Sequence, residues 1–284
     1  MRIHTIILEP GSAPFRIALL DLPGRAPERP PRVFLHGLGS SSIATFPEHA
    51  AERPQDAPRA ILIDLPGFGF SRNAAATWSF SIEAMADLVA AVLRDLGVTG
   101  ATVIGHSMGG SVAIALAARH PASTGTLIVA EPNLDPGVGT LSSHIAQQGE
   151  DAFLARGYGR LLHATTNQAA RGDAGAAIYL PTLQQALPTA LHRAAASLLE
   201  ARKPTFREHL HALAMSIPTT FILGDRTPGL TGLDSLGEAG VALATIPNAG
   251  HVMMDDNPTA FVAALLAAED RAAGIDTDPP LPRP

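Results

Sequence analysis

The chain has 284 residues, of which 46% are hydrophobic and 16% charged, so it is long enough for one large α/β domain with an insertion or for two small domains. Its formal net charge of −6, without a run of basic residues, gives no indication of binding to nucleic acid or to an anionic membrane surface. Because the sequence contains no cysteine, it excludes disulfides, thiolate catalysis and zinc–thiolate sites.

The first residues do not have the pattern of a targeting segment. Glu9, Pro10 and Pro14 interrupt the apolar stretches, which argues against a signal peptide. No apolar run approaches the ~18–20 residues that a membrane-spanning helix needs. We therefore expect no membrane span and a cytoplasmic location.

The first half of the chain alternates strand patterns with helix patterns. Segments 3–8 and 15–20 are predicted to form an antiparallel hairpin, joined by a turn rich in Gly, Ser and Pro. A helix is predicted over 81–96, because Ser81 is a good N-cap residue, apolar side chains recur at helical spacing and Gly97 follows. The further strands are predicted at 33–35, 60–63, 101–104 and 126–130. Such alternation predicts a mostly parallel sheet.

The pattern changes at about residue 138. From there to 215 the strand signal disappears, and 141–163 and 183–214 are predicted to be helical. The expected breaks are Pro181, Pro188 and Pro204. After this helical insertion, strands are predicted at 219–223 and 241–246, and a last helix at 257–270. Residues 274–284 are rich in Gly, Pro and Asp and are predicted to be disordered.

A serine lies between glycines at one strand-to-helix junction. Residues 105–109 have the pattern G-x-S-x-G, after the predicted strand and before an alanine-rich helical segment, 111–119. A sharp turn there would place Ser107 in a strained backbone conformation, for which the flanking glycines leave room. The pattern therefore predicts an exposed hydroxyl at the N-terminal end of a helix, a nucleophile elbow.

Four motifs, in this order, resemble those of the α/β-hydrolase superfamily. They are His36-Gly37-Leu38-Gly39, D-L-P-G-F-G-F-S at 64–71, the elbow at 105–109 and Ala249-Gly250-His251. The resemblance covers nearly the whole chain. It implies an α/β-hydrolase fold, with a central mostly parallel sheet flanked by helices and a helical cap over the site. The core would comprise 1–133 and 216–273, the cap 134–215, and the disordered tail 274–284.

The same resemblance assigns the catalytic parts. A serine hydroxyl needs a base to take its proton, and His251 has the position of the family base for Ser107. The backbone N–H groups of Leu38 and Met108 would stabilise the negative oxygen of the tetrahedral intermediate. His36 is expected to support the loop that carries Leu38, and His106 occupies the variable position of the elbow.

The position of the acid departs from the family pattern. Most relatives have G-x-x-D after the strand predicted at 219–223, but 224–227 ends in Thr227, which cannot ionise. Glu131 ends the strand that follows the elbow unit, where some superfamily members carry their acid, and Asp225 lies two residues before Thr227. We favour Glu131, keep Asp225 as the alternative acid and place Asp135 third.

A serine at the elbow argues against the epoxide hydrolases and haloalkane dehalogenases, which use an aspartate there. We therefore expect hydrolysis of a carboxylic ester through an acyl-enzyme, without metal or organic cofactor. The partner would be a small, largely apolar substrate, with Leu38 and Trp78 lining its pocket. The alternatives are C–C bond hydrolysis or another acyl-transfer hydrolysis on the same site and, in another class, a ligand-binding protein with a vestigial triad. The oligomeric state stays open.

Overall fold

The computed structural model describes residues 2–6, 15–50, 56–75, 77–137 and 139–275. These residues include an eight-stranded sheet with the order β1-β2-β4-β3-β5-β6-β7-β8. The pairs β1/β2 and β2/β4 are antiparallel and the others parallel, which confirms the predicted antiparallel pairing of the first two strands and the mostly parallel sheet. The turn predicted between the first two strands lies at 7–14, outside the described residues. The strands are β1 (Arg2–Ile6), β2 (Phe15–Leu22), β3 (Arg32–Leu35), β4 (Ala60–Ile63), β5 (Ala101–His106), β6 (Thr124–Ala130), β7 (Thr219–Gly224) and β8 (Ala242–Ile246).

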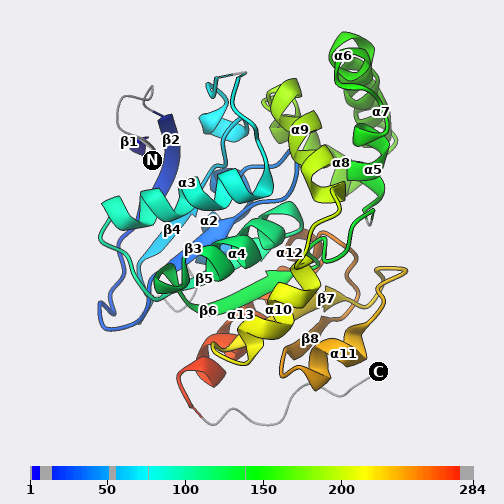
Figure 1. Ribbon diagram of the computed structural model, residues 1–284. Helices are drawn as coiled ribbons and strands as arrows, with labels where there is room; N and C mark the ends of the chain where they lie inside the picture. Colours follow the sequence, from blue (N-terminus) through cyan, green and yellow to red (C-terminus); the bar gives the residue numbers. More distant parts are fainter. Residues whose placement is uncertain (1, 7–14, 51–55, 76, 138, 276–284) are drawn as a thin grey trace.

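The central strands are buried on both faces. In β5, Val103 belongs to the core on one side of the sheet and Ile104 to the core on the other. The first core includes residues of α3 (Ile82–Asp95) and α4 (Met108–Arg119), and the second includes residues of α13 (Pro258–Ala272). Figure 1 labels these three helices beside the sheet. Strands that are covered on both faces have continuous apolar sequences. This explains why the central strands could be predicted from short apolar segments.

The capping prediction for α3 is confirmed. The Ser81 hydroxyl accepts a hydrogen bond from the Ala84 N–H at 3.2 Å, and Gly97 follows the helix with a φ of 66°. Two short helices, α1 (Ser42–Thr45) and α2 (Pro47–Ala50), occupy a region without a clear pattern in the sequence.

The insertion is helical, and most of it projects beyond the sheet (Figure 1). Pro188 begins one helix and Pro204 lies just before another, but the break predicted at Pro181 is wrong. Pro181 stands near the C-terminal end of its helix, where its missing N–H removes only one late hydrogen bond. The elements are α5 (Thr140–Ala146), α6 (Glu150–Ala152), the π-helical turn η3 (Phe153–Gly157), α7 (Tyr158–Ala170), α8 (Ala174–Leu183), α9 (Pro188–Leu199) and α10 (Phe206–Ala214).

Two helices of the insertion also contact the helices that flank the sheet. Helix α10 contacts α4 and β7 and so helps to cover the sheet, and α9 contacts α3, whereas α5 contacts α9 and α7 contacts α8. The chain then adds α11 (Leu233–Glu238), which the sequence pattern did not predict, and α12 (Met253–Asp256) before α13. The predicted tail lies outside the described residues from 276 onward.

A buried ion pair joins β3 to α13. Arg32 Nε and Nη2 donate to the two carboxylate oxygens of Glu269 at 2.6 and 2.7 Å, and the side chains are only 3% and 7% exposed. This two-bond geometry fixes the last helix against the middle of the sheet. Within the described part of the chain, no helix combines the length and the apolar character needed to cross a membrane.

Candidate active site

Ser107 occupies a sharp turn between β5 and α4. Its φ of 52° and ψ of −121° are strained for a residue with a side chain. A Cβ on Gly109 would stand 2.2 Å from the Leu35 carbonyl oxygen, and one on Gly105 would stand 2.4 Å from the Gly109 oxygen. Only glycine fits these two positions, so the G-x-S-x-G spacing has a steric cause.

Glu131 follows β6 directly and is joined to His251. The Nδ1 atom of His251 donates to Oε2 of Glu131 at 2.7 Å, and the Gly224 N–H donates to Oε1 at 2.9 Å. The Glu131 side chain is 2% exposed, whereas that of His251 is 49% exposed. Glu131 also has a positive φ of 43°, which turns the chain sharply at the strand end.

The other candidate acids have different partners. The carboxylate of Asp225 accepts the N–H groups of Asn248 and Ala249 at 2.9 and 3.1 Å. Asp135 pairs with Arg207 at 2.7 Å. The structure therefore brings Glu131 next to His251, and it places Asp225 beneath the loop that leads to this histidine.

Thr227, at the usual family position of the acid, has a buried hydroxyl. Within the part of the chain that the structure describes, this hydroxyl has no hydrogen-bond partner. It supplies no charge to His251.

The His106 side chain contacts both the backbone and the ring of His251. Its Nε2 atom donates to the His251 carbonyl oxygen at 2.8 Å, and the two rings lie 4.8 Å apart, centroid to centroid. Burial, together with the neighbouring His251, lowers the pKa of His106 to about 3, so this ring is neutral at pH 7. We expected only a variable elbow position here, and nothing in the spacing pointed to this contact.

His36 holds the loop that precedes Leu38. The Leu65 N–H donates to Nε2 of His36 at 2.9 Å, which leaves the proton on Nδ1, and Nδ1 donates to the Gly37 oxygen at 2.8 Å. Burial lowers the pKa of His36, so the ring keeps this neutral form. These hydrogen bonds agree with the expectation that His36 supports the loop that carries Leu38.

The loop that carries Leu38 lies beside Ser107. A Cβ on Gly37 would stand 3.3 Å from the Ser107 Cβ. For the N–H groups of Leu38 and Met108, the structure gives no acceptor in the described ranges. The Leu38 carbonyl oxygen, in contrast, accepts the Tyr179 hydroxyl of α8 at 2.9 Å. Two backbone donors therefore remain available near the serine.

Asp64 ties this loop to the next one. Its Oδ1 accepts the Ser41 hydroxyl at 2.8 Å and the Ile43 N–H at 3.1 Å, while Oδ2 accepts the Phe70 N–H at 2.9 Å. The carboxylate is fully buried. It fixes two loops at the edge of the sheet where Ser107 lies.

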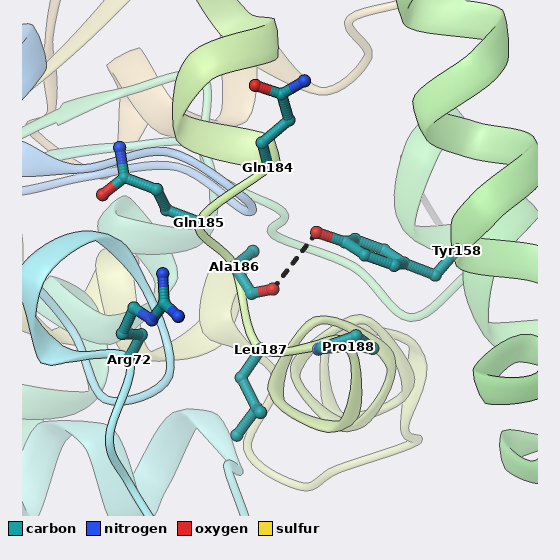
Figure 2. A pocket seen from close by; sticks show the side chains of 7 residues that line it. All are labelled: Arg72, Tyr158, Gln184, Gln185, Ala186, Leu187 and Pro188. Atoms are coloured by element: carbon teal, nitrogen blue, oxygen red, sulfur yellow. Dashed lines mark hydrogen bonds between the residues drawn. The ribbon is translucent and has the colours of Figure 1, made fainter.

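Trp78, predicted to contact substrate, packs edge-on against Phe80 with ring centroids 5.1 Å apart. Its substrate contact stays a prediction. A cavity of about 220 Å³ lies beside the turn from α8 to α9 and is lined by Arg72, Tyr158 and residues 184–188 (Figure 2). In the described ranges, no cluster of three or more His, Asp and Glu side chains could hold a metal ion.

A sequence model described as the alpha/beta hydrolase family matches residues 33–265. The chain belongs to the alpha/beta hydrolase family. The match extends from β3 into α13 and so includes the elbow, Glu131 and His251.

Known members of the family differ in their named activities. A 2-hydroxy-6-oxononadienedioate/2-hydroxy-6-oxononatrienedioate hydrolase of Burkholderia vietnamiensis is 36% identical over 99 residues, which is 34% of each chain. The chain thus matches about a third of the length of this relative. The mouse sn-1-specific diacylglycerol lipase ABHD11 is 27% identical over 258 residues, 83% of this chain and 80% of that protein.

Among solved structures, a thermophilic esterase from Thermogutta terrifontis superposes with a TM-score of 0.74. The two chains are 20% identical, and the superposition covers 96% of this chain and 99% of the esterase. At this identity the likeness shows the fold.

Proposed function

We propose that this protein hydrolyses a carboxylic ester through an acyl-enzyme on Ser107. The observation that supports this most strongly is the 2.7 Å hydrogen bond between His251 and Glu131, at the sheet edge that presents Ser107. In this proposal Ser107 is the nucleophile, His251 the general base and Glu131 the acid that orients it.

The reaction begins with the formation of a tetrahedral intermediate. Ser107 Oγ attacks the ester carbonyl carbon while its proton moves to Nε2 of His251. Glu131, bonded to Nδ1, holds the ring in the tautomer that has Nε2 free to accept, and it stabilises the imidazolium that forms. The carbonyl oxygen becomes negative in the tetrahedral intermediate, where the N–H groups of Leu38 and Met108 would bind it.

The alcohol leaves first, which gives the acyl-enzyme, and the carboxylic acid leaves second. Collapse of the intermediate breaks the bond to the alcohol oxygen, which takes the proton from Nε2 of His251. Water then attacks the acyl-enzyme, His251 accepts a proton from that water, and return of this proton to Ser107 Oγ releases the carboxylic acid. These steps balance without a cofactor.

Helices α5 to α9 would act as the cap over this site. Tyr179 and Leu183 of α8 contact the loop of Leu38, since a Cβ on Gly39 would stand 2.2 and 3.3 Å from them. Leu183 is fully buried and Leu38 nearly so. An apolar wall at the loop of Leu38 favours a small, largely apolar acyl or alcohol group.

A second candidate reaction is C–C bond hydrolysis on the same site. The Burkholderia relative favours it, because its name describes an unsaturated 2-hydroxy-6-oxo dicarboxylate, the enol form of a vinylogous diketone. Attack on the ketone carbon would give the same tetrahedral oxyanion, with a carbon leaving group in place of an alcohol.

The test compares p-nitrophenyl acetate and butyrate with a vinylogous diketone, using wild type and Ser107→Ala. We expect ester turnover by the wild type and its loss in the variant. Labelling by a fluorophosphonate probe should require Ser107 and persist in Ser111→Ala, four residues along α4. Turnover of the diketone alone would favour the second reaction. Absence of both turnover and labelling would favour a ligand-binding protein, and full esterase activity in Ser107→Ala would contradict the mechanism.

A further inference from the structure

The loop at 37–40 forms a tight turn whose conformation depends on one peptide group. The Ser40 N–H donates to the Gly37 oxygen at 3.1 Å, and Gly39 has a φ of 74° while Leu38 has no positive φ. This combination defines a type II turn. A type I turn closes the same hydrogen bond with the central peptide, here Leu38–Gly39, rotated by roughly half a turn. The closing bond alone therefore does not fix that peptide.

A side chain from α8 does hold the central peptide. The Tyr179 hydroxyl donates to the Leu38 carbonyl oxygen at 2.9 Å. The contact depends on Gly39, because a Cβ there would stand 2.2 Å from the hydroxyl oxygen. Burial raises the pKa of the Tyr179 hydroxyl, which keeps it protonated and able to donate. The bond thereby restrains the ψ of Leu38 and the φ of Gly39, the two dihedral angles that distinguish the turn types.

We propose that Tyr179 is a positioning residue for the oxyanion loop, through its hydrogen bond from α8 to the Leu38 carbonyl. The proposal rests on the proposed function, in which the Leu38 N–H binds the oxyanion. The Leu38 N–H belongs to the preceding peptide, Gly37–Leu38, so Tyr179 acts on it by anchoring Leu38 to α8. When the bond is absent, the central peptide is free to rotate and Leu38 loses this anchor, so a smaller fraction of molecules holds its N–H beside Ser107.

The chain contains only one other tyrosine, and it provides a matched control. The Tyr158 hydroxyl donates to the carbonyl oxygen of Leu183 at 2.8 Å. It also donates to that of Ala186 at 3.3 Å, the bond drawn in Figure 2. Both acceptors belong to the insertion, so this hydroxyl does not reach the loop of Leu38. Tyr158→Phe and Tyr179→Phe each remove one hydroxyl that donates to a backbone carbonyl, but only the second removes a bond to the oxyanion loop.

The test measures kcat and KM for p-nitrophenyl butyrate in the wild type and the two variants. Tyr179→Phe should lower kcat by about tenfold, less than the roughly 10²–10³ for loss of a whole oxyanion donor, with KM nearly unchanged. Tyr158→Phe should stay within about threefold of wild type in kcat. A trifluoromethyl ketone, whose adduct carries an oxyanion, should lose affinity in Tyr179→Phe by a factor similar to kcat. Equal kcat in the two variants, or an effect confined to KM, would overturn the proposal.

Hydrogen exchange of the amides of residues 37–40 separates this proposal from the proposed function, because it needs no substrate. We expect faster exchange in Tyr179→Phe than in wild type or Tyr158→Phe. A wild type that turns over no substrate would refute the proposed function, and unchanged exchange would refute the positioning role of Tyr179 whether or not the wild type is active.

Discussion

Glu131 and His251 are joined by a 2.7 Å hydrogen bond although 120 positions separate them in the chain. Glu131 reaches the histidine from the end of β6, and the Gly224 N–H at the end of β7 occupies its second oxygen. A carboxylate held at both oxygens has little freedom to turn away. The two neighbouring strands thus fix the direction of the carboxylate before any substrate arrives.

His106 should position His251 through the carbonyl oxygen of that residue. His106→Ala removes the 2.8 Å bond and the ring packed against His251, so we expect kcat to fall by about tenfold or more. His106→Gln retains an N–H donor and should recover most of this loss. Kinetics with p-nitrophenyl butyrate provide the measurement, and equal activity of the alanine and glutamine variants would argue against positioning by this bond.

Stability should fall in acid partly because of His106. Its pKa is about 3 in the folded protein and 6.5 ordinarily, so between these values the unfolded chain binds the extra proton. The free energy of unfolding is therefore highest, as far as this group is concerned, above pH 6.5, and it decreases as the pH falls toward 3. Between pH 7 and pH 5 this one group should remove about 2 kcal/mol. Urea unfolding at both pH values measures the decrease in the free energy of unfolding between pH 7 and pH 5. In His106→Gln this decrease should be smaller than in the wild type by about the same amount. An identical loss in both proteins would contradict the assignment.

A side chain at position 37 should reduce activity because it would crowd His106 and Ser107. In Gly37→Ala the new methyl would stand 3.1 Å from His106 Nδ1 and 3.3 Å from the Ser107 Cβ, so it would crowd Ser107 without a clash with the backbone. We expect a folded protein with kcat/KM reduced by about tenfold or more. Gly159→Ala, which would contact nothing within 4 Å, is the control and should keep full activity. Full activity in Gly37→Ala would show that the loop lies farther from Ser107.

The Arg32–Glu269 pair should affect stability asymmetrically. Glu269→Met leaves a buried guanidinium without its carboxylate, and we expect a loss of about 3–5 kcal/mol in the free energy of unfolding. Arg32→Met/Glu269→Met removes both charges and should return to within about 1–2 kcal/mol of wild type. Denaturant unfolding measures both values. A double variant less stable than the single one would mean that the pair itself is strongly stabilising.

The sequence predicted the central sheet and the elbow because both have strict local requirements. Buried parallel strands must be apolar, and Gly105 and Gly109 leave no room for a side chain. The insertion was harder to predict. Pro181 lies inside α8, and α10 packs on the core, because tertiary contacts rather than local pattern decide where these helices lie.

From the sequence, Glu131 could be favoured as the acid, but the contacts that separate it from Asp225 could not be predicted. Glu131 and Asp225 both follow strands, and their separate partners, His251 and the amides of Asn248 and Ala249, depend on loops distant in the chain. The contacts of His106 and Tyr179 had no signal, since a histidine within an elbow and a tyrosine within a helix are compatible with many environments. The catalytic roles of Ser107, His251 and Glu131 stay predictions.

The most direct test compares ester turnover by wild type, Glu131→Gln and Asp225→Asn. Glu131→Gln replaces the charged partner of His251, so kcat should fall by roughly 10²–10⁴ while the fold is kept. Asp225→Asn weakens two bonds to the loop before His251 and should cost no more than about tenfold. Loss of orders of magnitude in Asp225→Asn, with Glu131→Gln close to wild type, would contradict the assignment of the acid.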